Sequence, residues 1–185
     1  EDLNEIISRW DKLGEKARIE GTNLHNQIEN FYNNKEYINS KEFEKFLSFH
    51  NKFIQSKYEP YRTEWRVFDD SKLLAGTLDM VYKKENNEVF IFDWKRSKKI
   101  ISSDGSIEKE NPFENCLKGL SHMSSTDYNK YSLQQNIYKY ILEKNYGFKV
   151  SSMNLLVLHP YYPSYHIVKI EDLPLETEYV INSIN

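Results

Sequence analysis

Apolar residues recur every three or four positions through the first sixty residues of the chain, and this spacing predicts helices. Residues 1–19 form the first expected helix, which Gly21 should interrupt. A second helix is expected over residues 22–32 with Thr22 as its N-cap, and a third over residues 40–55. The N-terminal part of the chain, up to residue 60, is therefore predicted to be helical.

Beyond Pro60 the pattern changes to short runs rich in Val, Ile, Thr and aromatic residues, which are typical of strands. The expected elements are strands Thr63–Phe68, Thr77–Tyr82 and Glu88–Trp94, an irregular polar segment 97–130, a helix 131–147 closed by Gly147, and strands 152–159 and 165–170. This order predicts one α/β domain over residues 1–185, in which helices flank a mixed central sheet over residues 61–175.

Composition narrows the class of protein only slightly. Apolar residues make up 39% of the chain, charged residues 29%, and the net charge is −3, so any attraction for nucleic acid must come from a local positive patch. The single cysteine, Cys116, excludes an internal disulfide and a four-cysteine iron–sulfur cluster. It fits a reducing, intracellular compartment. No apolar run reaches the roughly 18 residues that span a bilayer, so no membrane association is expected.

Two aspartates lie inside the apolar strands, where an unpaired charge is costly to bury. Asp79 follows "GTL", and Asp93 follows "VFIF" and precedes Trp94 and Lys95. Asp93 and Lys95 share one face of their strand. Asp79 joins them only if the hairpin loop has an odd number of residues, for example Glu85–Asn87, or if a strand contains a bulge. A two-residue Asn86–Asn87 turn would turn the two acids to opposite faces.

If the two carboxylates converge, they repel each other unless a cation lies between them. Mg²⁺ prefers oxygen ligands and is usually held by one or two protein carboxylates. A cation bound there lowers the pKa of water, which makes it a nucleophile for a phosphodiester, and Lys95 would orient that water or neutralise charge on the phosphate.

The pattern "GTLD" followed by "DWK" resembles the PD-(D/E)XK nuclease superfamily, and its surroundings resemble the RecB-type exonuclease branch without the iron–sulfur cluster. "GTNLHNQIE" is similar to the upstream helix motif of that branch and matches it at Gly21, His25 and Glu29. "QQNIY" is similar to its Gln-x-x-x-Tyr helix and matches it at Gln134 and Tyr138.

The resemblance implies an αβββαβ restriction-endonuclease-like core with extra N-terminal helices and an exonuclease-like activity on the ends or single strands of DNA. It implies Mg²⁺ or Mn²⁺ as the cofactor, since a histidine ligand favours Mn²⁺ beside Mg²⁺. The residues that it implicates are His25, Asp79 and Asp93 as metal ligands, Asp79, Asp93, Lys95, Gln134 and Tyr138 as catalytic residues, and Glu29 and Glu64 as accessory acids.

Two further interpretations stay open. The combination of a histidine, acids and a lysine also resembles the cap-snatching RNA endonucleases of segmented RNA viruses. A catalytically inactive nuclease fold that binds nucleic acid is the second alternative. Because the chain begins at Glu1 rather than methionine, it is also open whether it belongs to a larger polypeptide or works with a replication or repair partner.

The run "KRSKK" continues directly from the predicted site, and its Arg96, Lys98 and Lys99 are candidates for phosphate contacts. The segment "HPYYPSYH" over residues 159–166 combines tyrosines with prolines. It is interpreted as a rigid turn, with a stacking platform for unpaired bases as the alternative.

Overall fold

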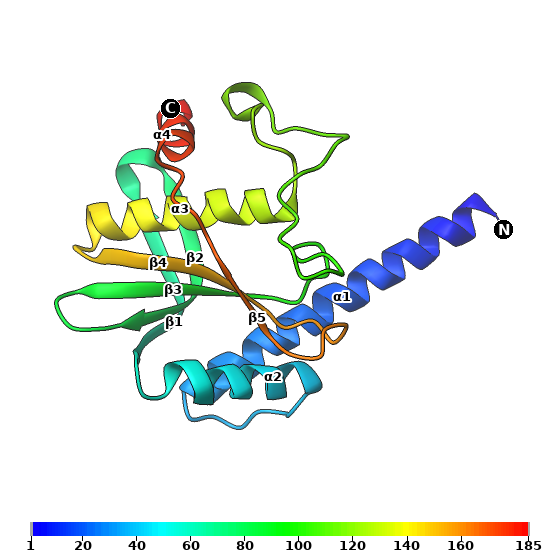
Figure 1. The fold of residues 1–185 in the computed structure, drawn as a ribbon, viewed down its shortest axis with the longest axis horizontal. Helices are drawn as coiled ribbons and strands as arrows, with labels where there is room; N and C mark the ends of the chain where they lie inside the picture. The colour runs from blue at the N-terminus through cyan, green and yellow to red at the C-terminus, as the bar shows by residue number, and fades with distance from the viewer. Residues whose placement is uncertain (1, 185) are drawn as a thin grey trace.

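The computed structural model describes residues 2–184, and within them a mixed five-stranded sheet is flanked by helices on both faces (Figure 1). The strand order follows the chain, and β3 and β4 are parallel while every other neighbouring pair is antiparallel. The strands are β1 (Glu59–Asp69), β2 (Leu74–Lys83), β3 (Glu88–Lys95), β4 (Lys149–Val157) and β5 (His166–Lys169). The prediction of an α/β fold with a mixed sheet is confirmed.

The helices divide between the two faces of the sheet (Figure 1). They are α1 (Leu3–Tyr32), α2 (Lys41–Phe49) continued by a π-helix (His50–Ile54), α3 (Asp127–Asn145) and α4 (Pro174–Ser183), with short 3-10 helices at Asp70–Lys72 and Lys118–Leu120. α3 is the crossover between the parallel strands β3 and β4 and covers one face, while α2 and the second half of α1 cover the other. Of the helices that the structure describes, none combines the length and apolar character that crossing a bilayer requires.

α1 is one continuous helix, so the expectation that Gly21 interrupts it is wrong. A glycine inside a helix costs only about 1 kcal/mol relative to alanine, which the packing of Leu24 and Ile28 in the core outweighs. Thr22 is correspondingly not an N-cap, because its hydroxyl donates to the carbonyl oxygen of Arg18 one turn earlier. His25 therefore lies within one continuous helix.

Each face of the sheet has its own core. The α3 side is largely aliphatic and is built around Val67, Val89, Ile91, Ile141 and Leu155. The α1 and α2 side is mainly aromatic and includes Phe43, Phe46, Phe49, Phe92 and Trp94. Alternation along β3 sends Phe92 and Trp94 to the aromatic side, so Asp93 and Lys95 face α3.

The hairpin between β2 and β3 has a three-residue loop, Glu85–Asn87, as the convergence of the two acids requires. The ladder pairs Lys83 with Val89, and the N–H of Lys84 donates to the carbonyl oxygen of Glu88 over 2.9 Å. Asn86 and Asn87 both have positive φ, of 59° and 58°. Asparagine tolerates this left-handed conformation better than most residues do, so the sequence suits this turn.

The segment between β3 and α3 is largely irregular, as expected, and contains two isolated bridges. α3 begins earlier than predicted, at Asp127, because the side chain of Thr126 caps it by accepting from the N–H of Asn129. α4 was not expected from the sequence. Its Pro174 lies in the first turn, where a missing N–H costs nothing.

Candidate metal centre

Three carboxylates from three adjacent strands lie in one row across the sheet. The pairs on either side of Glu64 in β1 place it opposite Asp79 in β2. The last pair between β2 and β3 is Met80 with Phe92, and the same register continued by one step places Asp79 opposite Asp93. Opposite residues in antiparallel strands share a face, so the odd loop brings the acids together.

The ladder between β2 and β3 stops where the acids begin, and a side chain takes over its last hydrogen bond. Oδ2 of Asp79 accepts from the backbone N–H of Trp94 over 2.7 Å. Asp79 is only 8% exposed, so this bond both satisfies a buried amide and fixes the direction of the carboxylate. Its other oxygen, Oδ1, faces His25.

His25 reaches this row from α1 and is held by its far ring nitrogen. Nε2 lies 3.0 Å from the carbonyl oxygen of Trp94. Because a carbonyl only accepts, Nε2 carries the proton and the lone pair of the neutral ring lies on Nδ1. Nδ1 is 3.5 Å from Oε1 of Glu64 and 3.6 Å from Oδ1 of Asp79. A lone pair facing two carboxylates is stable only with a proton or a metal ion between them.

One nitrogen and two carboxylate oxygens form the donor set. The ligand atoms of His25, Glu64 and Asp79 all lie within 4.8 Å of one another. Carboxylate oxygens suit Mg²⁺ and Mn²⁺, and an added imidazole favours Mn²⁺. A metal-binding histidine commonly donates its second ring N–H to a backbone carbonyl, as His25 does. The residues present therefore fit a divalent cation.

Without a cation, the buried carboxylates of the cluster repel each other, and the pKa values of Asp79 and His25 are raised. Burial, followed by the charge of Asp93, raises the pKa of Asp79 to about 7, although the charges of His25 and Lys95 oppose the rise. Burial lowers the pKa of His25, but its hydrogen bond to Glu64 and the charges of the nearby acids prevail and raise it to about 9. Bound protons thus take the place of a cation.

Asp93, which is expected to be a metal ligand, lies beside the three-donor cluster of His25, Glu64 and Asp79. Its Oδ1 accepts from Nε2 of Gln135 over 3.2 Å, and its Oδ2 lies 2.5 Å from Nζ of Lys95. This close ion pair lacks hydrogen-bond geometry, so Oδ2 is a buried oxygen without a hydrogen-bond donor in residues 2–184. Glu64, expected only as an accessory acid, takes the place of Asp93 in the cluster.

Lys95 lies on the α3 side of the three carboxylates, where Asp93 and Tyr131 contact its ammonium. Its ammonium lies 4.1 Å from the centre of the Tyr131 ring, which is within the range of a cation–π interaction. Its side chain is 17% exposed, and Asp93 and Tyr131 direct its ammonium.

The structure separates the two expected residues of α3. Gln134 is exposed on α3 and does not contact the acids, whereas the next residue, Gln135, is 1% exposed and binds Asp93. Tyr138 is buried near the site, and its pKa is raised by burial and by the charges of Asp93 and Asp79. A Cβ atom on Gly76 would lie 2.2 Å from Cε1 of Tyr138, so Gly76 leaves room for this ring.

Gln135 and Tyr131 are the residues that the sequence interpretation missed. The buried stripe of α3 passes through Tyr128, Ser132, Gln135 and Leu142. Stepping along this stripe by three or four residues would have selected Gln135 instead of Gln134.

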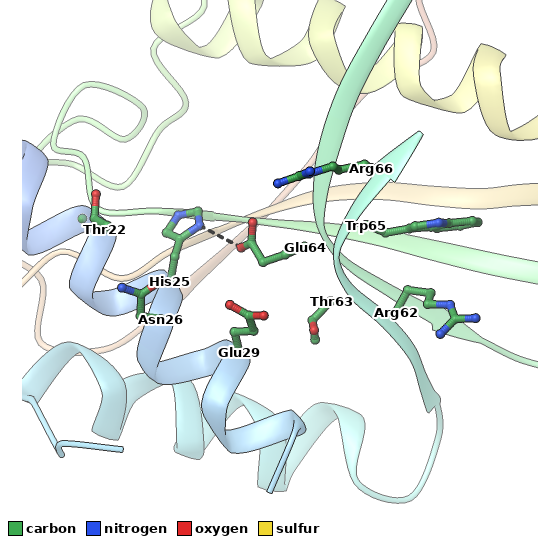
Figure 2. A pocket seen from close by; sticks show the side chains of 10 residues that line it. Thr22, His25, Asn26, Glu29, Arg62, Thr63, Glu64, Trp65 and Arg66 are labelled. Atoms are coloured by element: carbon green, nitrogen blue, oxygen red, sulfur yellow. Dashed lines mark ion pairs between the residues drawn. The ribbon is translucent and has the colours of Figure 1, made fainter. Parts of the chain in front are cut away.

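A cleft of about 890 Å³ opens beside the cluster between α1 and β1. Figure 2 shows His25 and Glu29 lining it from α1, and Glu64 and Arg66 pointing toward it from β1. Glu29 lies one turn after His25 but outside the three-donor cluster. Glu64 itself has φ of +44°, a conformation that costs a residue with a side chain about 1–3 kcal/mol and that concentrates at functional sites.

The basic run after β3 divides into two kinds of cation. Arg96 is only 12% exposed at its side chain, and its guanidinium pairs with Glu20 at 2.7 Å and Glu42 at 2.8 Å. These two ion pairs neutralise its charge and tie α1 and α2 to the end of β3, so Arg96 is less suited than its neighbours to the phosphate contact expected of it. Lys98 and Lys99 are exposed, as phosphate contacts require.

No family model matches the sequence, and no curated protein matches it. Function is therefore inferred from the residues of the site and from their geometry.

Proposed function

We propose that the chain is a divalent-metal-dependent nuclease that hydrolyses phosphodiester bonds of DNA, with exonuclease-like action on ends or single strands. The observation that carries the proposal is the convergence of His25, Glu64 and Asp79 within 4.8 Å of one another, next to the ion pair of Asp93 and Lys95. Acids and a lysine of this kind are suited to phosphodiester chemistry.

The resemblance to the PD-(D/E)XK nucleases adds support from the order of the elements. In that superfamily a helix precedes three antiparallel strands, and a second helix leads to a further strand. Here α1, β1, β2, β3, α3 and β4 occur in the same order, with α2 and the π-helix His50–Ile54 between α1 and β1. Asp79 lies on the second of these strands, and Asp93 and Lys95 lie on the third.

In the proposed mechanism His25, Glu64 and Asp79 hold Mg²⁺ or Mn²⁺. When bound, such a cation acts as a Lewis acid toward a phosphoryl oxygen and lowers the pKa of water. Lys95 supplies a positive charge to the attacked phosphate or orients the water. Asp93 and Tyr131 direct the lysine, and Gln135 holds Asp93 in place.

Cleavage of labelled single-stranded and duplex DNA, with matched RNA, in Mg²⁺, Mn²⁺ or EDTA tests the proposal. We expect cleavage that needs metal and that Asp79→Asn abolishes, because the amide keeps the shape of the side chain but is a poor ligand. Asp172→Asn is the matched control, since Asp172 is an exposed acid that pairs with Lys139 away from the site.

The outcomes separate the alternatives. A preference for RNA would replace the DNA substrate with the RNA endonuclease alternative. Binding of nucleic acid without cleavage in either metal would overturn the enzyme and favour the binding module. Equal cleavage rates for wild type and Asp79→Asn would remove the cluster from the mechanism.

A further inference from the structure

We propose that Tyr161 and Lys98 form a subsite for single-stranded nucleic acid beside the metal centre, an inference that rests on the proposed function. The two side chains are exposed and lie together. Tyr161 is 63% exposed, and Nζ of Lys98 lies 5.6 Å from the centre of its ring. An aromatic face for a base and a cation for a phosphate are the two chemical groups that such a ligand needs.

The backbone is anchored by hydrogen bonds both before and after Tyr161 in the chain. Nζ of Lys45 donates to the carbonyl oxygens of His159 and Tyr162, over 2.8 Å and 2.5 Å. Tyr162 is buried, and its hydroxyl donates to the carbonyl oxygen of Ile101 over 2.6 Å. The segment forms a turn, as its sequence predicts, and this turn presents Tyr161 to solvent. Because the backbone is already anchored, only the side chain of Tyr161 has to become ordered when a base stacks on its ring.

The backbone of the subsite is joined to the metal centre through Lys95. Lys98 follows Lys95 by three residues, so their Cα atoms are at most about 11 Å apart. The segment with Tyr161 also begins beside Lys95, since the N–H of Leu158 donates to the carbonyl oxygen of Lys95 over 2.8 Å. With about 3.4 Å between stacked nucleotides of one strand, a strand held at the metal centre reaches Tyr161 within a few nucleotides.

The local charge is suited to a polyanion although the whole chain has a net charge of −3. After the effect of burial, the positive charges of Arg96 and Lys98 lower the pKa of His159, although the charge of Glu42 opposes them. Arg96 is neutralised by two glutamates. Lys98 and the exposed Lys99 are the cations of the run that remain available to phosphates.

The chemistry of the subsite favours a single strand over a duplex. A base stacks on a tyrosine only when its face is free, and in a duplex the neighbouring base pairs cover both faces. Alanine substitution of a stacking aromatic residue weakens binding by about 5- to 150-fold. The effect is expected for every base, because each has a π-face, and for DNA and RNA strands alike.

The test measures binding of the chain to fluorescent single-stranded and duplex oligonucleotides in EDTA, where no metal-dependent cleavage occurs. We expect Tyr161→Ala to weaken single-strand binding by about 5- to 150-fold without changing duplex binding, and Tyr161→Trp to preserve it. Lys98→Gln should reduce the slope of log K against log salt by about 0.7, the value for one phosphate of a single strand. Trp10→Ala and Lys12→Gln are the controls, because both residues are exposed in the N-terminal half of α1.

Unchanged single-strand affinity of Tyr161→Ala, or equal losses for Tyr161→Ala and Trp10→Ala, would overturn the subsite. Failure of the proposed nuclease function gives a different result. In that case wild type cleaves nothing in Mg²⁺ or Mn²⁺, while Tyr161→Ala still loses its single-strand binding. Cleavage by wild type with unaltered binding by Tyr161→Ala would leave the nuclease in place and remove the subsite.

Discussion

The imidazole of His25 donates its Nε2–H to the backbone carbonyl oxygen of Trp94 over 3.0 Å. This bond connects α1 to the end of β3 and fixes which ring nitrogen faces the acids. It keeps Nδ1 directed at Glu64 and Asp79 whether or not the ring is charged. The histidine is thus already oriented as a ligand, and only a proton has to leave for a cation to bind.

Metal binding should strengthen as the pH rises. The pKa of His25 is raised from 6.5 to about 9 and that of Asp79 from 3.8 to about 7. Between pH 7 and 9 a cation therefore displaces about one proton, so its affinity should rise about tenfold per pH unit and level off above about pH 9. Calorimetry with Mn²⁺ in two buffers of different ionisation enthalpy measures the proton release.

In the same titration His25→Gln should release no proton from the ring and should bind Mn²⁺ at least tenfold more weakly. His122→Gln is the control, because His122 pairs with Glu176 on the surface. An affinity for Mn²⁺ that does not change between pH 6 and 9 would contradict the protonated cluster.

Asp79→Asn should stabilise the metal-free protein near pH 8. The folded pKa of Asp79 lies above its ordinary 3.8, so its favourable contribution is complete below pH 3.8 and is lost as the pH rises through about 7. Above that pH the ionised carboxylate opposes folding, and the amide removes the penalty. We expect a gain on the order of 1 kcal/mol, or about 2–4 °C in Tm. Thermal unfolding in EDTA at pH 3.5 and pH 8 measures it, and a lower Tm than wild type at pH 8 would refute the prediction.

Removing Lys95 should cost stability as well as activity. Lys95→Ala leaves the buried carboxylate of Asp93 without its cation, a change that costs about 3–5 kcal/mol when one partner of a buried ion pair is lost. Adding Asp93→Asn removes the unpaired charge, so the double variant should recover much of the loss. Neither variant should cleave DNA. Urea unfolding of the four proteins in the cycle gives the coupling energy.

Lys139→Ala is the matched control for Lys95→Ala. It breaks an ion pair with Asp172, whose side chain is 65% exposed, and should cost less than about 1 kcal/mol. If Lys95→Ala costs no more than this control, the ion pair of Lys95 and Asp93 does not hold the site together.

Gly76→Ala should displace the Tyr138 ring. The added Cβ would lie 2.2 Å from Cε1 of that ring, so we expect a loss of about 1–3 kcal/mol and lower activity. In a Tyr138→Ala background the same substitution should cost almost nothing, since the ring is gone. Gly14 lies inside α1, and a Cβ atom added to it would contact no neighbouring atom within 4 Å. Gly14→Ala should therefore stabilise the protein by about 0.5–1 kcal/mol. Chemical unfolding distinguishes these outcomes, and equal effects at Gly76 and Gly14 would exclude the contact.

The sequence predicts the order of most elements and the strands that carry the acids, because strand periodicity and turn residues are local signals. It could state the condition for the convergence of Asp79 and Asp93 but could not choose between a two-residue and a three-residue loop. That choice depends on which residues of the turn adopt left-handed φ. In the structure Asn86 and Asn87 both do so.

Other features depend on the whole fold and are absent from local patterns. A five-residue motif could not distinguish Gln134 from Gln135, because the rotation of α3 is set by the side chains that it buries against the sheet. From the sequence Gly21 is interpreted as a helix break, but in the structure the packing of the neighbouring turns outweighs the cost of a glycine in the helix. The positive φ of Glu64 arises in the middle of β1 and has no sequence signal.

The loop Glu85–Asn87 lies at the far end of β2 and β3 from Asp79 and Asp93, yet its length decides which way they face. Side chains in this loop line neither the cluster nor its cleft, so they act on the site only through the turn that Asn86 and Asn87 form with left-handed φ. The number of residues acts on the site directly. An insertion or deletion of a single residue there would rotate one acid out of phase with the other, whereas a change of two would restore the phase.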